Sequence, residues 1–210
     1  MRAGEAGALE ALGTTPERLL TLRQVHGGEV LVVDDDTRAL ALADPQPYDA
    51  VVTQKRNIAL GIWTADCLPI LLADNKKKVI AAVHAGWRGI WGGVIEHTVA
   101  RMQGIFQSSP DDIVAGIGPG IGPCCYEVKE DVTSLFRNAY AQADQFIQER
   151  DGKTYLDLRG CARLELTEAG ILPANIAVVD VCTSCRQDLF FSYRRDSNGA
   201  GRQLSLILLK

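Results

Sequence analysis

The stretch that decides the fold runs from Thr64 to Gly89, TADCLPILLADNKKKVIAAVHAGWRG. Residues 68–73 and 79–83 are nearly unbroken apolar runs, and residues 74–78 between them are polar and turn-forming. Short continuous apolar runs are typical of strands that are buried on both faces. The stretch therefore predicts two antiparallel strands inside a sheet, with a cysteine and a histidine at their outer ends.

The position of the turn decides whether that cysteine and histidine meet. A two-residue turn at Asn75-Lys76 would place Cys67 directly opposite His84. Directly opposed residues have Cβ atoms about 4.5–5.5 Å apart, which lets a thiolate and an imidazole share one metal ion or one proton. A slip of one residue would turn the two side chains to opposite faces of the sheet.

Length and composition limit the class of protein. The chain has 210 residues, 47% hydrophobic residues and a net charge of −4, which describes one globular domain over residues 1–210. The absence of a basic surface argues against nucleic acid as a partner. No apolar run approaches the roughly 18–20 residues that span a bilayer, and no signal peptide is recognisable, so we expect a cytoplasmic protein without a membrane partner.

The remaining pattern predicts an α+β fold with a central mixed sheet covered by helices. Expected strands are residues 19–22, 29–33, 49–53, 58–63, 112–117, 176–181 and 204–209, and expected helices are residues 91–102, 129–140 and 156–169. His26 is expected at the tip of a hairpin between the first two strands, because Gly27 and Gly28 permit a sharp return.

Three histidines occur in the chain, and they are not equivalent. His97 falls on the polar side of a predicted helix and is expected at the surface. This leaves His26, Cys67 and His84, which form an open catalytic zinc set of three ligands plus one water. Zinc would lower the pKa of that water toward about 7.

Two other chemistries remain open for the same residues. His84 could lower the pKa of Cys67 in a metal-free nucleophile pair. A Cys with two His residues could also hold a single type-1 copper, although three histidines cannot supply a multicopper cluster. Spacing alone does not decide between metal and thiol nucleophile.

The other cysteines give weaker signals. Cys182 and Cys185 form a CxxC that could be redox-active or half of a zinc site, but no second CxxC exists, so structural thiols are expected. Cys124 and Cys125 are adjacent, and at most one of them is expected to face a site. Four arginines lie beside the candidate site segments: Arg23, Arg88, Arg194 and Arg195. Their guanidinium groups would suit phosphate or carboxylate, although a surface salt bridge is the more common use of any single arginine.

Five motifs in this order resemble the YfiH/DUF152 family, which includes bacterial polyphenol-oxidase-like or peptidoglycan-editing proteins and a mammalian laccase-domain protein. They are RQVHG (23–27), TADCLPILLAD (64–74), VHAGWRG (83–89), GIGPGIGPCCYEV (116–128) and CTSC with FFSYRRD and GRQ (182–203). The resemblance implies an α+β sandwich like that of cysteine-hydrolase toxin domains. It also implies a catalytic zinc bound by His26, Cys67 and His84.

The resemblance further implies phosphorolysis of adenosine, inosine and methylthioadenosine, and deamination of adenosine. We expect a monomer or homodimer. Its partners would be purine nucleosides and phosphate. Asp66 or a nearby acid would move protons during deamination, while Arg88 and Arg23 would clamp phosphate. Expected substrate contacts are Arg23, Gln24, Arg88, Cys124, Tyr193 and Arg194.

Two alternatives belong to different classes of enzyme. One is a copper-dependent polyphenol oxidase, or laccase. The other is a cysteine-type amidase that edits peptidoglycan precursors, in which Cys67 is acylated and no metal is needed. Family members also begin with an added segment, containing an Asn-Leu-Ser-like stretch and an Asn-Arg pair, for which only Arg2 could stand in here.

Overall fold

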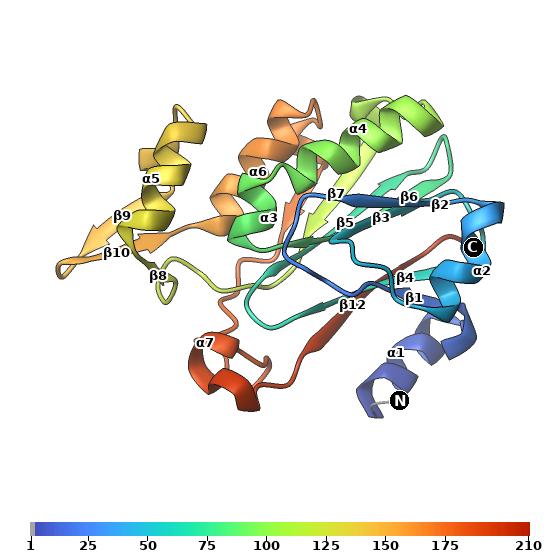
Figure 1. The fold of residues 1–210 in the computed structure, drawn as a ribbon, viewed down its shortest axis with the longest axis horizontal. Coiled ribbons are helices and arrows are strands. Elements are labelled where there is room, and N and C mark those ends of the chain that lie inside the picture. Colours follow the sequence, from blue (N-terminus) through green and yellow to red (C-terminus); the bar gives the residue numbers. More distant parts are fainter. Residues whose placement is uncertain (1–2) are drawn as a thin grey trace.

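The computed structural model describes residues 3–210 and shows an α+β architecture built in layers (Figure 1). A six-stranded mixed sheet lies between a layer of helices and a smaller three-stranded sheet. A second three-stranded sheet stands at one end of the molecule beside α5 (Glu130–Ala139). The predicted mixed sheet covered by helices is therefore confirmed. Arg2, which was expected to stand in for the family's added N-terminal segment, lies outside the described residues.

The six-stranded sheet has the order β11-β7-β5-β6-β3-β2. Its strands are β2 Val30–Val33, β3 Ala50–Thr53, β5 Leu68–Asp74, β6 Val79–Ala85, β7 Ile113–Ile117 and β11 Ile176–Val178. The smaller sheets are β1-β4-β12, with β1 Leu19–Thr21, β4 Ala59–Thr64 and β12 Gln203–Leu208, and β8-β10-β9, with β8 Glu127–Val128, β9 Ile147–Arg150 and β10 Lys153–Leu156.

Helices cover one face of the large sheet, and the sheet β1-β4-β12 covers the other (Figure 1). The helices besides α5 are α1 Ala3–Leu12, α2 Asp35–Ala43, α3 Trp87–Trp91, α4 Val94–Phe106, α6 Leu158–Glu168 and α7 Tyr193–Asp196. None of the helices within residues 3–210 is long and apolar enough to cross a membrane.

The apolar runs of β5 and β6 serve two hydrophobic cores. Leu68 and Ile70 of β5 pack in the core beneath the helices. Ile80 and Ala82 of β6 pack in the core beneath the smaller sheet. Because side chains alternate across a strand, one continuous apolar run fills both cores.

The pairing of β5 with β6 differs from the predicted register by two residues. Pro69, not Cys67, pairs with His84, and four residues, 75–78, connect the strands. The Asp74 carboxylate accepts hydrogen bonds from the backbone N–H groups of Lys76 and Lys77, at 2.8 and 2.9 Å, which stabilises the longer turn. A slip of two residues keeps Cys67 and His84 on one face.

The predicted hairpin around His26 is wrong. β1 pairs in parallel with β4, whereas β2 pairs in parallel with β3, so the two strands belong to different sheets. The loop between β1 and β2 crosses from one sheet to the other. In this loop, the backbone N–H groups of Val25, His26 and Gly27 donate hydrogen bonds to the Asp49 carboxylate. His26 therefore lies in a crossover loop that is tied to the start of β3.

The predicted helix over residues 91–102 is divided. Gly93 has a φ of +76°, which separates α3 from α4. Trp91 leaves the expected buried face and is 48% exposed, while Val94 and Met102 are buried as predicted. His97 is exposed, as expected, and its Nδ1 lies 2.8 Å from the Gly28 carbonyl oxygen.

Candidate metal centre

The three predicted ligands meet at one place in the structure. His26 comes from the crossover loop, Cys67 directly precedes β5, and His84 lies in β6. Their ligand atoms all lie within 4.8 Å of one another, and the two imidazole rings meet edge to face with centroids 4.7 Å apart. His84 is buried while His26 is exposed, so the cluster opens toward solvent on one side.

A buried carboxylate that the sequence did not single out organises these ligands. Asp49 is fully buried and lies 2.7 Å from Nδ1 of His84. It also accepts hydrogen bonds from the backbone N–H groups of His26, at 2.9 Å, and Gly27, at 2.6 Å. A proton on Nδ1 of His84 therefore leaves its Nε2 free to bind a metal. The available signal was an aspartate placed directly before a fully buried strand.

Electrostatics favour a thiolate beside a charged imidazole. Burial raises the pKa of Cys67, but hydrogen bonds from His26 and His84 outweigh it and lower that pKa to about 6. Burial lowers the pKa of His84, while its hydrogen bonds to Asp49 and Cys67 raise it to about 9. In metal-free protein at neutral pH, Cys67 and His84 therefore form a thiolate–imidazolium pair.

The local backbone is shaped for this cluster. His26 has a φ of 61° and Asp66 a φ of 90°, both in the region that side chains other than glycine rarely adopt. A Cβ on Gly86 would lie 2.9 Å from Sγ of Cys67 and 3.4 Å from Cδ2 of His26. Only glycine at position 86 leaves room for the sulfur and the imidazole.

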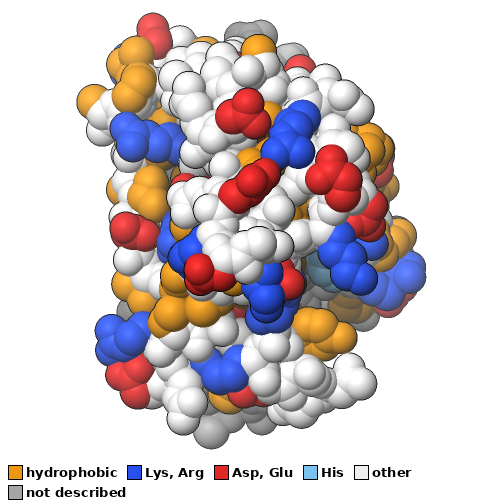
Figure 2. Space-filling view, turned by 90° about the vertical axis from the view of Figure 1, so that its left-hand side faces the viewer, with side chains coloured by type: hydrophobic (Ala, Val, Ile, Leu, Met, Phe, Trp, Pro, Cys, Tyr) orange, Lys and Arg blue, Asp and Glu red, His pale blue; other side chains and the backbone are white. Residues whose placement is uncertain are grey.

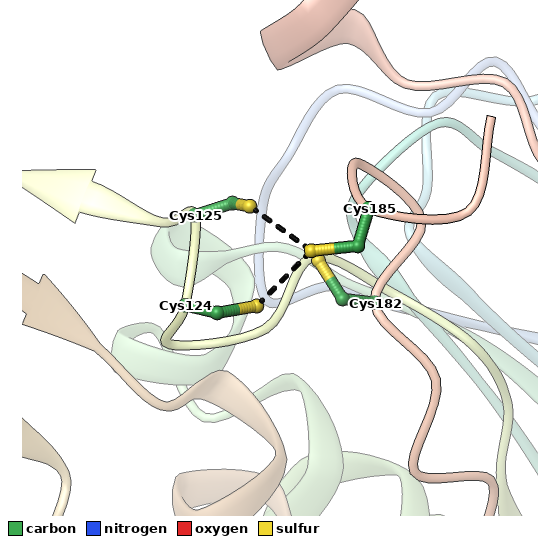
Figure 3. Close-up of side chains that lie close together, drawn as sticks. All are labelled: Cys124, Cys125, Cys182 and Cys185. Carbon is green, nitrogen blue, oxygen red and sulfur yellow. Dashed lines mark hydrogen bonds between the residues drawn. The ribbon is translucent and has the colours of Figure 1, made fainter.

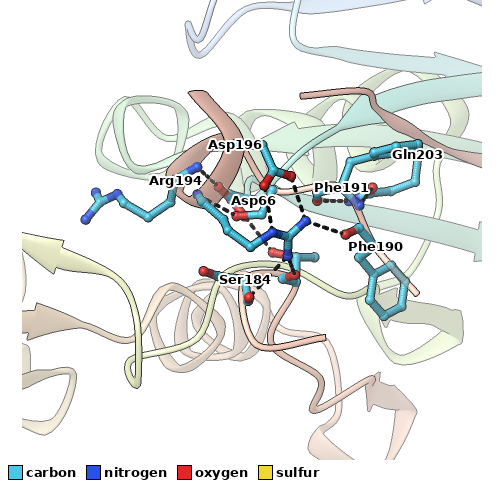
Figure 4. A network of polar contacts seen from close by, with 10 residues as sticks. Asp66, Ser184, Phe190, Phe191, Arg194, Asp196 and Gln203 are labelled. Carbon is cyan, nitrogen blue, oxygen red and sulfur yellow. Dashed lines mark hydrogen bonds and ion pairs between the residues drawn. The ribbon is translucent and has the colours of Figure 1, made fainter. Parts of the chain in front are cut away.

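Asp66 joins the site to the C-terminal segment (Figure 4). Its carboxylate accepts a hydrogen bond from the Thr183 hydroxyl and another from the backbone N–H of Arg194, each at 2.7 Å. Arg195 extends the network to the carbonyl oxygens of Thr183 and Ser184, at 3.1 Å. Each Asp66 oxygen accepts one hydrogen bond, so Asp66 positions the C-terminal segment, and its expected role in proton transfer stays a prediction.

Tyr126 is a second site residue that the sequence reasoning missed. The Arg194 guanidinium lies 5.2 Å from its ring centroid and donates to the Glu127 carbonyl oxygen at 2.9 Å. Burial and then the charge of Cys67 raise the pKa of Tyr126, while Arg194 and Arg88 oppose that rise. Cys67, Arg194 and Arg88 therefore lie close enough to Tyr126 for their charges to act on it. The available signal was an aromatic residue in the Gly- and Pro-rich loop.

Among the other expected substrate contacts, Gln24 supports a loop, and the rest are exposed: Arg23, Arg88 and Tyr193. Gln24 exchanges two hydrogen bonds with the backbone of Trp63, at 2.7 and 2.9 Å, so its amide supports the loop. Arg88 is exposed, and its guanidinium lies 4.4 Å from the Trp87 ring centroid. Arg23 is exposed, and Tyr193, at 60% exposure, lies on the surface of α7.

Cys124 is not grouped with the His26 cluster. Its sulfur lies with those of Cys125, Cys182 and Cys185, so the expectation that at most one of the adjacent cysteines faces a site was wrong. Backbone N–H groups of Cys125 and Tyr126 both bond to the Gly122 carbonyl oxygen, which curls the chain and turns successive side chains the same way. Alternation holds in strands but not in such a turn.

Basic side chains lie near histidine on one face of the molecule. In the space-filling view of Figure 2, the visible area of histidine borders Lys and Arg side chains. Asp and Glu side chains are spread over the same face, so positive charge does not dominate it.

Comparison with known proteins identifies the family. A family model described as "Multi-copper polyphenol oxidoreductase laccase" matches residues 3–210. The chain belongs to this family. The resemblance to YfiH/DUF152 proteins is thereby confirmed, and relatives in this laccase-type family are named as purine nucleoside enzymes.

Three relatives illustrate the similarity of this family member to known proteins. A purine nucleoside phosphorylase of Clostridium acetobutylicum is 37% identical over 190 residues, covering 90% of this chain and 76% of the relative. An adenosine deaminase of an unknown prokaryotic organism is 35% identical over 207 residues, covering 95% and 78%. The crystal structure of the hypothetical protein YfiH of Bacillus licheniformis has a TM-score of 0.91 at 33% identity and covers 98% of this chain and 79% of that chain.

Proposed function

We propose that the chain is a zinc-dependent purine nucleoside enzyme that catalyses phosphorolysis of adenosine, inosine and methylthioadenosine and deamination of adenosine. The observation that carries the proposal is the convergence of His26, Cys67 and His84. The printed names of the relatives supply the reaction class, purine nucleoside phosphorylase and adenosine deaminase.

The donor set fits zinc. One thiolate and two imidazoles within 4.8 Å match an open site with three protein ligands and one free position. Asp49 fixes the tautomer of His84, as outer carboxylates do for metal-bound histidines. When bound, zinc supplies a Lewis acid and lowers the pKa of a coordinated water.

The chain's own residues would bind and orient the nucleoside. Tyr126 offers an aromatic face, and Arg194 lies against it, 5.2 Å from the ring centroid. The Asp66 carboxylate accepts hydrogen bonds from the backbone of Arg194 and the hydroxyl of Thr183, so it fixes the C-terminal segment beside Cys67. Arg88 and Arg23 are exposed and remain our proposed clamps for phosphate.

The first test combines metal content with product analysis. Protein purified without added metal is incubated with adenosine in phosphate buffer, and adenine, inosine and hypoxanthine are quantified. Zinc in the protein with adenine and inosine formed would support the proposal. Replacing His84 by Ala should abolish both activities, because they use one centre; either activity retained near the wild-type rate would refute the shared site.

Two alternative functions would each be favoured by a different set of results. Copper in the purified protein, blue colour on copper loading and oxygen consumption with phenols would favour the polyphenol oxidase. Trapping of Cys67 by an electrophile in metal-free protein that still processes an amide substrate would favour the cysteine amidase. The low pKa of Cys67, about 6, is the observation that favours this alternative.

A further inference from the structure

A second sulfur cluster lies outside the centre described above. Cys124 and Cys125 come from the loop between β7 and β8, and Cys182 and Cys185 come from the segment after β11. The four sulfur atoms all lie within 4.8 Å of one another, and the side chains point toward a common point (Figure 3). Each of the four is a free thiol.

The spacing of the sulfurs fits one tetrahedral ion. Sγ of Cys185 lies 3.5 Å from Sγ of Cys124 and 3.4 Å from Sγ of Cys125. Four thiolates around one zinc, each about 2.3 Å from it, lie about 3.8 Å apart. The two short contacts lie slightly below that value, and all four sulfurs lie within 4.8 Å of one another.

The backbone holds the thiols in place without a metal. The N–H of Gly122 donates to Sγ of Cys182 at 3.2 Å, a contact that favours a thiolate. Gly120 forms a parallel bridge with Cys182, and the N–H of Thr183 bonds to the Gly120 carbonyl oxygen at 3.1 Å. The loop and the segment are therefore already aligned before a ligand joins them.

Positive charge lies beside the cluster. Arg159 is only 8% exposed, donates to the Val181 carbonyl oxygen at 3.0 Å and lies 3.1 Å from the Asp180 carboxylate. Arg150 donates to the Cys124 carbonyl oxygen at 3.1 Å. Four thiolates with one divalent ion carry two net negative charges, and the Arg150 guanidinium reduces the cost of holding them, while Arg159 is already paired with Asp180.

A disulfide would explain less of this arrangement. Sγ of Cys185 lies 3.4 and 3.5 Å from its two sulfur neighbours, well beyond the roughly 2.05 Å of an S–S bond, and it could be joined to only one of them. All four sulfurs converge, and the chain supplies no further sulfur or imidazole to them within the described residues. Soft thiolate ligands in a closed tetrahedral set are typical of structural zinc.

We infer that Cys124, Cys125, Cys182 and Cys185 form a closed zinc site that fastens the loop at residues 118–128 to the segment at residues 182–195. Zinc replaces the thiol protons, and four Zn–S bonds form as four protons leave. The clamp lies between the two segments that carry Tyr126 and Arg194, so it would hold their stacking in place. This site shares no ligand with the His26 cluster.

The test removes the other centre first, so that the remaining zinc reports on the cysteine cluster alone. The 210-residue chain carrying Cys67→Ala is purified under reducing conditions without added metal, and zinc per chain is measured. We expect one zinc per chain, its loss in Cys67→Ala/Cys185→Ala, and its retention in the control Cys67→Ala/Cys161→Ala. Cys161 is a buried thiol of α6 outside the cluster, which makes it a matched control.

Two further readouts keep the inference testable should a variant fold poorly. Cobalt added to metal-free Cys67→Ala protein should give intense visible bands with sulfur-to-cobalt charge transfer that are lost in Cys67→Ala/Cys185→Ala. Zinc should also protect all four cysteines from alkylation, as mass spectrometry would show. No zinc in Cys67→Ala, iron in its place, or a disulfide between two of the four cysteines in wild-type protein would overturn the inference.

Discussion

Two clusters in this chain use cysteine, but they are built in different ways. The His26–Cys67–His84 cluster takes its members from a crossover loop, the residue before β5 and strand β6, and it rests on a fully buried carboxylate, Asp49. The four-cysteine cluster takes its members from two loops, and two of its thiols are exposed. In our proposals, zinc at the first cluster keeps one coordination position open, and zinc at the second is closed by four thiolates. Open sites suit catalysis and closed sites suit structure, so the two should respond differently to substitution.

The largest expected difference is between Cys67→Ser and Cys185→Ser. Loss of a hydrogen-bond partner of a metal ligand costs up to roughly 100-fold. Cys67→Ser removes a ligand itself, so adenosine turnover should fall by more than this. Cys185→Ser should keep turnover within about tenfold but lower the Tm by several degrees. Steady-state kinetics and thermal unfolding measure the two effects. Equal loss of activity in both variants would remove the distinction between the clusters.

Asp49→Asn tests whether the buried carboxylate sets up the first cluster. The amide no longer compels a proton on Nδ1 of His84, so metal affinity or activity should fall by roughly 10–100-fold. Metal affinity is measured by competition with a chelator. Asp74→Asn is the control, because Asp74 is also buried but serves the turn after β5. A similar loss in the control would show a general effect of buried aspartates.

Gly86→Ala tests the space around the Cys67 sulfur. The added Cβ would lie 2.9 Å from Sγ, so one of the two groups must shift and activity should fall by about tenfold or more. Gly104→Ala in α4 is the matched control, since nothing lies within 4 Å of its added Cβ. That control should raise stability by about 0.5–1 kcal/mol. Unchanged kinetics in Gly86→Ala would contradict the packing account.

The smallest expected effect is the pH dependence of Cys67 in metal-free protein. Alkylation requires the thiolate, so its rate should rise with pH through about 6, the lowered pKa of Cys67. His84→Ala removes one hydrogen bond and one positive charge, which should move the midpoint upward toward the ordinary value near about 8.5. Mass-resolved alkylation rates measure this. A midpoint near the ordinary value in wild-type protein would contradict the thiolate–imidazolium pair.

The sequence predicted the centre of the fold because burial leaves a simple signature. The apolar runs of β5 and β6 had to lie inside a sheet, and the residues at their ends had to lie near each other. The exact register depended on two hydrogen bonds of Asp74, which a pattern of hydrophobicity does not contain. Since the slip was two residues, the predicted ligand pair survived the error.

The partners that depend on tertiary contacts were missed. Asp49 is a ligand support only because β3 pairs with β6, and a single sequence does not contain that pairing. Tyr126 and Arg194 lie close together although 68 positions of the sequence separate them. Cys124 and Cys125 share one cluster because a turn at Gly122 replaces strand alternation.

The measurement that tests the account most directly is anomalous diffraction from crystals of protein purified without added metal, recorded on either side of the zinc absorption edge. The account predicts two peaks that vanish below the edge, one among His26, Cys67 and His84 and one among the four cysteine sulfurs. A structure without a peak at His26, Cys67 and His84, in protein that turns over adenosine, would contradict the central claim.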